Sequence, residues 1–103
     1  MKIAIDARMI KHGKMHGIAR YAFELCRGVN SYSSDHDYYL FVNHDSPLHN
    51  YNWNAHIKIV EVFSEWISIK EQLELPKILK LNNIDLFHCT SFVGLLFSPC
   101  KVI

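Results

Sequence analysis

The stretch Lys2–Val29, which reads KIAIDARMIKHGKMHGIARYAFELCRGV, decides the fold of this chain. Its apolar run IAI ends in Asp6, as a buried strand does when it reaches its polar end. A loop with Gly13 and Gly17 follows. After Gly17, apolar residues recur three and four positions apart, which is the period of one helix face: Ile18, Tyr21, Ala22, Leu25 and Val29. A strand, a glycine loop and a helix in this order are the start of a doubly wound α/β domain.

The glycine loop indicates a ligand that carries phosphate. Glycines let backbone N–H groups approach a ligand closely, and the partial positive charge of a helix N-terminus suits phosphate. The alternative is that Gly13 and Gly17 serve only the geometry of a turn. The pattern is neither G-x-G-x-x-G nor a P-loop, because Met15 stands where a P-loop has Ser or Thr. A nicotinamide-dependent enzyme is therefore a weak alternative.

Hydrophobic periods along the rest of the chain predict the other elements. The first helix is expected from about Ile18 to Arg27, with Gly28 as its stop. A helical turn is expected after Ser46-Pro47. Residues 65–81 favour a second helix that is kinked or broken at Pro76, since proline lacks a backbone donor. The expected strands lie at residues 3–5, 38–42, 57–63, 84–89 and 101–103.

These elements predict an α/β, Rossmann-like domain with a mainly parallel sheet flanked by helices. The expected strand order is 3-2-1-4-5. The fifth strand is short at the end of the sequence, so residues 84–89 are expected to form an open, apolar edge. Open edges recruit other strands, and we therefore predict a homodimer formed through this sheet edge.

Composition excludes several classes of function. The formal net charge of +1 gives no long-range attraction for nucleic acid or anionic membranes. No apolar run approaches the roughly 20 residues that span a bilayer. The three cysteines are widely spaced and form no CxxC pair, which favours reduced thiols over a disulfide framework. We expect a cytoplasmic protein. The alternative is a peripheral location at the inner face of the membrane.

Several polar side chains are candidates for binding a ligand. His88 lies at the carboxyl end of a central strand, where open α/β sheets bind their ligands; the alternative is a histidine packed under a loop. Arg8 and Arg20 flank the glycine loop and could bind phosphate or sugar hydroxyls; the favoured alternative is that they are solvated surface arginines. His12 and His16 have a helical metal spacing but lie in a glycine loop without the glutamate of HExxH, so no metal site is expected.

Four segments occur in an order that carries a family resemblance: KIAIDARM, GIARYAFEL, WISIKEQLELPKIL and IDLFHCTSF. Together they resemble the N-terminal domain of family 4-type glycosyltransferases, which are retaining enzymes of the two-domain GT-B fold. The resemblance covers nearly the whole chain, and EQLELP following Trp66 is its most distinctive part. It implies that residues 1–103 are a partial, acceptor-side GT-B domain and that the C-terminal donor-binding domain is absent.

The resemblance also implies an activity. The parent enzyme would transfer a hexose, with mannose as the first guess, from a nucleotide-sugar to a hydroxyl of a sugar or lipid-linked acceptor. The setting would be surface polysaccharide biosynthesis, without a cofactor, a metal or nucleic acid. This chain alone is expected to be inactive. The alternative function is a non-catalytic, truncated α/β binding or interaction module.

The resemblance assigns roles to single positions. Gly17 matches the glycine that lies near the donor diphosphate, whereas Gly13 has no such firm match. The residues expected near the donor phosphates are Gly17, Gly13 and Arg20, and those expected to bind the acceptor are His88, Thr90 and Ser91. No catalytic residue is assigned within the chain.

Overall fold

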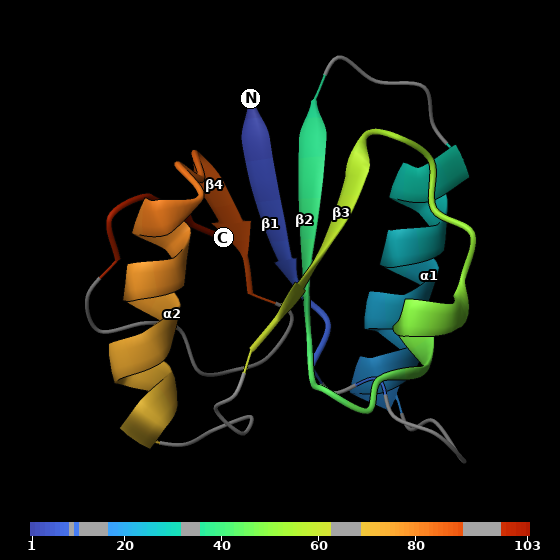
Figure 1. Cartoon of the computed structure of the whole chain (residues 1–103), viewed down its shortest axis with the longest axis horizontal. Coiled ribbons are helices and arrows are strands. Elements are labelled where there is room, and N and C mark those ends of the chain that lie inside the picture. Colours follow the sequence, from blue (N-terminus) through green and yellow to red (C-terminus); the bar gives the residue numbers. More distant parts are fainter. Residues whose placement is uncertain (9, 11–16, 32–35, 63–68, 90–97) are drawn as a thin grey trace.

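The computed structural model of this chain describes residues 1–8, 10, 17–31, 36–62, 69–89 and 98–103. This part of the chain forms a five-stranded sheet in the order β3-β2-β1-β4-β5, with α1 and α2 on opposite sides (Figure 1). Each neighbouring pair of strands is parallel. The expected Rossmann-like class and strand order are therefore confirmed. The elements are β1 (Lys2–Asp6), α1 (Gly17–Ser31), β2 (Asp37–Val42), the 3-10 helix η1 (Pro47–Asn50), β3 (Ile57–Glu61), α2 (Ile69–Leu81), β4 (Leu86–His88) and β5 (Lys101–Val102).

Each face of the sheet has its own core, because successive side chains of a strand point to opposite faces. On the α1 side, sheet residues such as Ile5 and Leu40 pack with small helix residues such as Ala22. On the α2 side, Phe41 packs with residues that include Leu79. Small side chains on α1 let that helix approach the sheet closely. The result is a three-layer arrangement whose helices leave the strand ends free of helical cover (Figure 1).

Helix α1 continues through Gly28 to Ser31, so the prediction that Gly28 stops it is wrong. The last carbonyls of the helix are satisfied by side chains from the connection before β3. The Nε2–H of His56 donates to the carbonyl of Val29 at 2.8 Å, and the side-chain amide of Asn54 donates to the next carbonyl. Because these groups replace the capping that a glycine turn supplies, the helix extends past its glycine.

Helix α2 likewise continues through Pro76, so of the predicted kink or break the break is wrong. Leu75 and Leu79 are completely buried against the sheet, and this packing outweighs the lost backbone hydrogen bond. The helix ends at Leu81, and Asn83 adopts a left-handed conformation with φ of 55°. The expected start of this helix, residues 65–68, lies outside the described residues. No helix in the described ranges is long and apolar enough to cross a membrane.

Strand β4 is paired on both sides, which contradicts the predicted open edge. It pairs with β1 on one side and with β5 on the other. Beyond the strands, the Cys89 N–H donates to the Ile103 carbonyl at 2.9 Å, and the Ile103 N–H donates to the Phe87 carbonyl at 3.0 Å. Three residues are therefore enough for the last segment to cover this short strand. Dimerisation stays a prediction, but its stated cause does not apply to β4.

Candidate functional site

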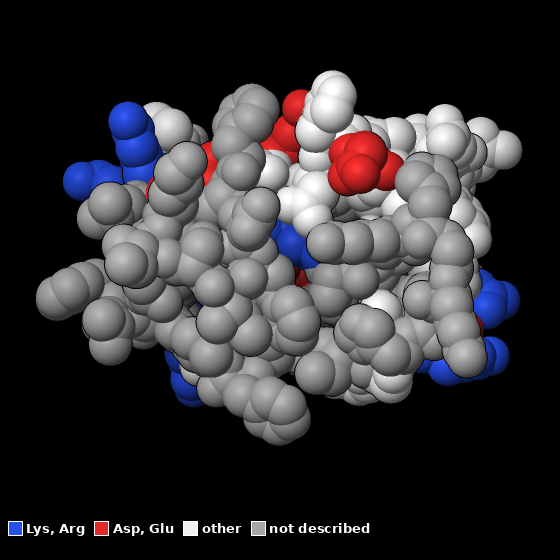
Figure 2. All heavy atoms as spheres, turned by 90° about the horizontal axis from the view of Figure 1, so that it is seen from below, with Lys and Arg blue, Asp and Glu red and all other residues white. Residues whose placement is uncertain are grey.

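The carboxyl ends of β1 and β4 define the candidate site. The strands β2 and β3 lie on one side of β1 in the sheet, and the later strands β4 and β5 lie on its other side. Open α/β sheets bind ligands outside the strand ends at such a switch point. Helix α1 also begins at this edge (Figure 1). Figure 2 looks onto it, with acidic and basic described side chains near its centre.

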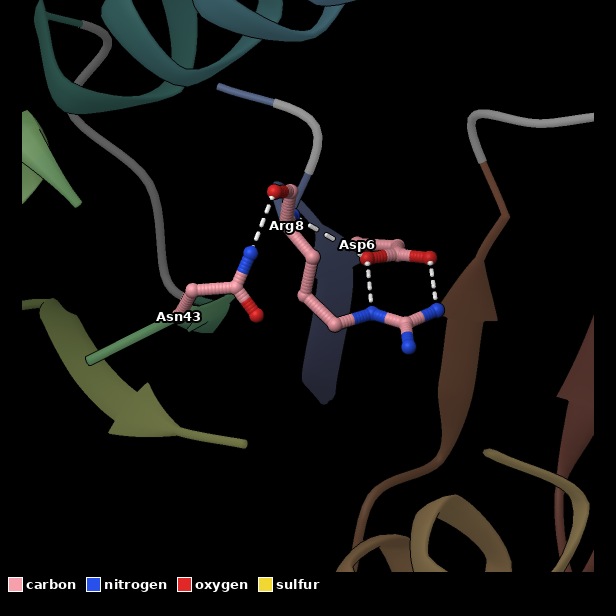
Figure 3. A network of polar contacts seen from close by, with 3 residues as sticks. All are labelled: Asp6, Arg8 and Asn43. Carbon is pink, nitrogen blue, oxygen red and sulfur yellow. Dashed lines mark hydrogen bonds and ion pairs between the residues drawn. The ribbon is translucent and has the colours of Figure 1, made fainter. Parts of the chain in front are cut away.

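An ion pair between Asp6 and Arg8 lies at the carboxyl end of β1 (Figure 3). Both side chains are completely buried, with Arg8 Nε 2.8 Å from Asp6 Oδ1 and Nη2 2.7 Å from Oδ2. The side-chain amide of Asn43, just past β2, donates to the Arg8 carbonyl at 2.8 Å. The expectation that Arg8 is a solvated surface arginine is therefore wrong. The pair fixes the chain where it leaves β1, because each partner satisfies the other's buried charge.

His88 faces α1 across the same edge. It is in register with Ile5, which belongs to the core on the α1 side. The Tyr21 hydroxyl lies 3.4 Å from His88 Nε2, a long hydrogen bond, and the ring centroids are 6.2 Å apart. Partial burial lowers the pKa of His88, which favours a neutral imidazole at pH 7. A neutral imidazole beside a phenol can both accept from and donate to the hydroxyl groups of a ligand.

Sequence reasoning missed Tyr21, which it assigned to the apolar stripe of the helix. The side chain is instead 53% exposed. The one signal in the sequence is its place one turn after Gly17, on a helix that must begin near the carboxyl ends of the strands. Tyr21 therefore adds an accessible aromatic ring to the candidate site.

Gly17 and Arg20 lie in the first turn of α1, and both are exposed. A Cβ added to Gly17 would meet no heavy atom within 4 Å among the described residues, and its φ lies outside the left-handed region. Neither packing against the described residues nor backbone conformation therefore requires glycine at this position. Glycine does leave the helix N-terminus accessible to a ligand.

Other predicted site residues lie outside the described part of the chain: Gly13, Thr90, Ser91, His12 and His16. Their places relative to His88 stay predictions. Within the described ranges, no three His, Cys, Asp or Glu side chains are grouped so as to hold a metal ion. Through the contact between Tyr21 and His88, the structure places the start of α1, with Gly17 and Arg20, at the same edge of the sheet as His88.

Comparisons with known protein families, with curated proteins and with solved structures found no match for this chain. Functional inference therefore depends on the sequence pattern and on the geometry of this edge.

Stability is expected to fall as the pH drops below about 6.5, because the pKa of His88 is lowered in the folded chain. Between that value and the lower folded pKa, the unfolded chain binds more protons and unfolding becomes easier. Above this window the stability is fully present. Urea denaturation at a series of pH values measures the effect. His88→Gln should flatten this part of the profile, whereas replacing the exposed His44 by glutamine should leave the His88 contribution in place.

Proposed function

We propose that this chain is the acceptor-side domain of a retaining GT-B glycosyltransferase, which transfers a hexose from a nucleotide-sugar to a hydroxyl acceptor. The family resemblance of four ordered segments supports the proposal. The strand order is the one expected for such a domain. The proposed donor is an NDP-hexose, with GDP-mannose as the first candidate. The proposed acceptor is a sugar or a lipid-linked sugar in surface polysaccharide biosynthesis.

One observation carries the proposal: the start of α1 and His88 share the switch-point edge, with Tyr21 between them. The N-terminus of a helix stabilises a leaving diphosphate through its N–H groups and partial positive charge. Gly17 keeps that approach open. His88, held neutral by partial burial, would bind and orient the acceptor hydroxyl. In this assignment the chain binds and positions the reactants, and a second domain supplies most donor contacts.

Residues 1–103 alone are expected to transfer no sugar and to bind nucleotide-sugars weakly, with a Kd of about 1 mM or above, because the proposed assignment gives most donor contacts to a second domain. Isothermal titration with GDP-mannose and UDP-glucose measures this affinity. Nuclear magnetic resonance then locates the binding: the amides of Gly17 and Tyr21 should shift, while that of His56, at the other end of α1, should not. Sub-micromolar binding, or shifts confined to the His56 end, would contradict the proposal.

The alternative function is a non-catalytic α/β binding module. Sequencing the DNA that follows the Ile103 codon distinguishes it from the glycosyltransferase. A reading frame that continues into a second Rossmann-like domain supports the glycosyltransferase. An immediate stop codon favours the binding module.

A further inference from the structure

A pocket of about 390 Å³ lies beside the C-terminal half of α1, far along the helix from Gly17. Its lining comes from α1 and from the segment between η1 and β3. The volume falls within the range of roughly 300–1,000 Å³ that is usual for small-molecule sites. Figure 1 shows η1 beside α1. The ring contact between Phe23 of α1 and Tyr51, which directly follows η1, joins the two parts of the lining. The pocket is therefore separate from the carboxyl edge of the sheet.

Aromatic rings form one wall of this pocket. Tyr51 and Trp53 have ring centroids 5.6 Å apart, and the edge of Tyr51 packs on Phe23 with centroids 5.5 Å apart. The indole N–H of Trp53 donates to the Leu48 carbonyl at 2.8 Å, which fixes that ring. Tyr51 is still 46% exposed. A rigid, accessible aromatic wall offers an apolar face to a ligand at little cost in entropy.

Charged groups on the helix form another part of the lining. Arg27 Nη1 lies 3.1 Å from Glu24 Oε1, so the guanidinium and the carboxylate hold each other in place. Arg27 also lies over the Phe23 ring, 5.8 Å from its centroid. The two charges cancel, and the lining therefore favours a neutral ligand. The pair presents donors and acceptors side by side, which matches neighbouring hydroxyl groups that each donate and accept.

Gly28 provides an independent observation. It lines the pocket and lies within α1, where glycine is less favourable than alanine. A Cβ at this position would meet no heavy atom within 4 Å among the described residues. Neither helix formation nor packing explains a glycine here. Its absent side chain does leave this part of the lining open.

We propose that this pocket binds one pyranose ring of a neutral saccharide, with its C–H face on Tyr51 and Trp53 and its hydroxyl groups on Glu24 and Arg27. A pyranose combines an apolar C–H face with hydroxyl groups around its rim. The C–H face complements the aromatic rings, and the hydroxyl groups complement the charged pair. The site goes beyond the proposed function, since it lies at the opposite end of α1 from the candidate site and does not depend on sugar transfer.

Titration of the ¹⁵N-labelled chain with methyl α-mannopyranoside, methyl β-galactopyranoside and maltose tests the proposal, with glycerol as a polyol that has no ring. At least one pyranoside should shift the Trp53 indole N–H and the Gly28 amide saturably, with a Kd of about 1 mM. Glycerol should not. Absence of a saturable shift with all three sugars up to about ten times that concentration would overturn the proposal. Shifts at Tyr21 and His88 alone would also overturn it, while supporting the site at the carboxyl edge.

Two variants separate binding from folding. Gly28→Leu fills the pocket with a good helix former, so it should abolish binding while the Tm stays the same or rises. Tyr51→Ala should weaken binding about tenfold. Leu81→Ala removes an exposed apolar side chain from α2 and should leave binding unchanged. Unchanged affinity in Gly28→Leu would show that the sugar binds elsewhere.

Discussion

Asp6→Asn is expected to lower the free energy of unfolding by about 3–5 kcal/mol, because it removes the carboxylate charge that pairs with the buried Arg8 guanidinium. Domains of this kind have a total stability of about 5–15 kcal/mol, so the loss is a large fraction of the whole. Urea denaturation followed by tryptophan fluorescence measures it. The charge is removed with little change in side-chain volume, and the effect therefore reports on the ion pair.

Matched variants isolate the role of burial. Glu24→Gln breaks the exposed pair with Arg27, whose side chains are 55% and 58% accessible, and should cost less than about 1 kcal/mol. The double replacement Asp6→Leu with Arg8→Met removes both buried charges and should recover much of the stability. An Asp6→Asn effect no larger than that of Glu24→Gln would contradict the importance assigned to the buried pair.

Under the proposed function, Gly17→Val is expected to lower sugar transfer by the full-length enzyme about 10²–10³-fold, the usual cost of losing one contact to a developing negative charge. The side chain would enter the space through which a diphosphate approaches the start of α1. The fold should be unaffected, because a Cβ at this position meets no described heavy atom within 4 Å and valine is a better helix former than glycine. A coupled transfer assay and thermal unfolding by circular dichroism measure the two properties.

Lys77→Val provides the control, since it places the same side chain at an exposed position of α2. It should change neither transfer nor folding by much. Unchanged turnover in Gly17→Val would remove this glycine from the donor site. An unfolded Gly17→Val domain would instead assign it a structural role.

Local patterns predicted most of the fold. The strand signals and the strand order agree with the structure, because each strand shows its period within a few residues and parallel crossovers allow few arrangements. The turn after Ser46 is also confirmed: its side chain accepts from the Leu48 N–H at 3.2 Å. Capping of this kind involves neighbouring residues only, and the sequence is enough to predict it.

Predictions failed where distant residues decide a local outcome. The end of α1 depends on His56, whose imidazole reaches the Val29 carbonyl 27 positions earlier. Helix α2 passes through Pro76 because Leu75 and Leu79 are buried against the sheet. Glycine and proline set only a local preference, and packing or capping from elsewhere in the chain outweighs it.

The candidate site likewise contains features that local sequence predicts and features that depend on distant residues. The sequence by itself placed His88 near the carboxyl end of a central strand and the start of α1 within one residue of Gly17, since both follow from local periods. The tertiary structure alone decided that Arg8 is buried with Asp6 and that Tyr21 lies beside His88, across 67 positions of sequence. A helical period identifies an apolar stripe, but where the stripe meets a strand end depends on how helix and sheet pack. That packing determines which polar side chains lie close enough to act together.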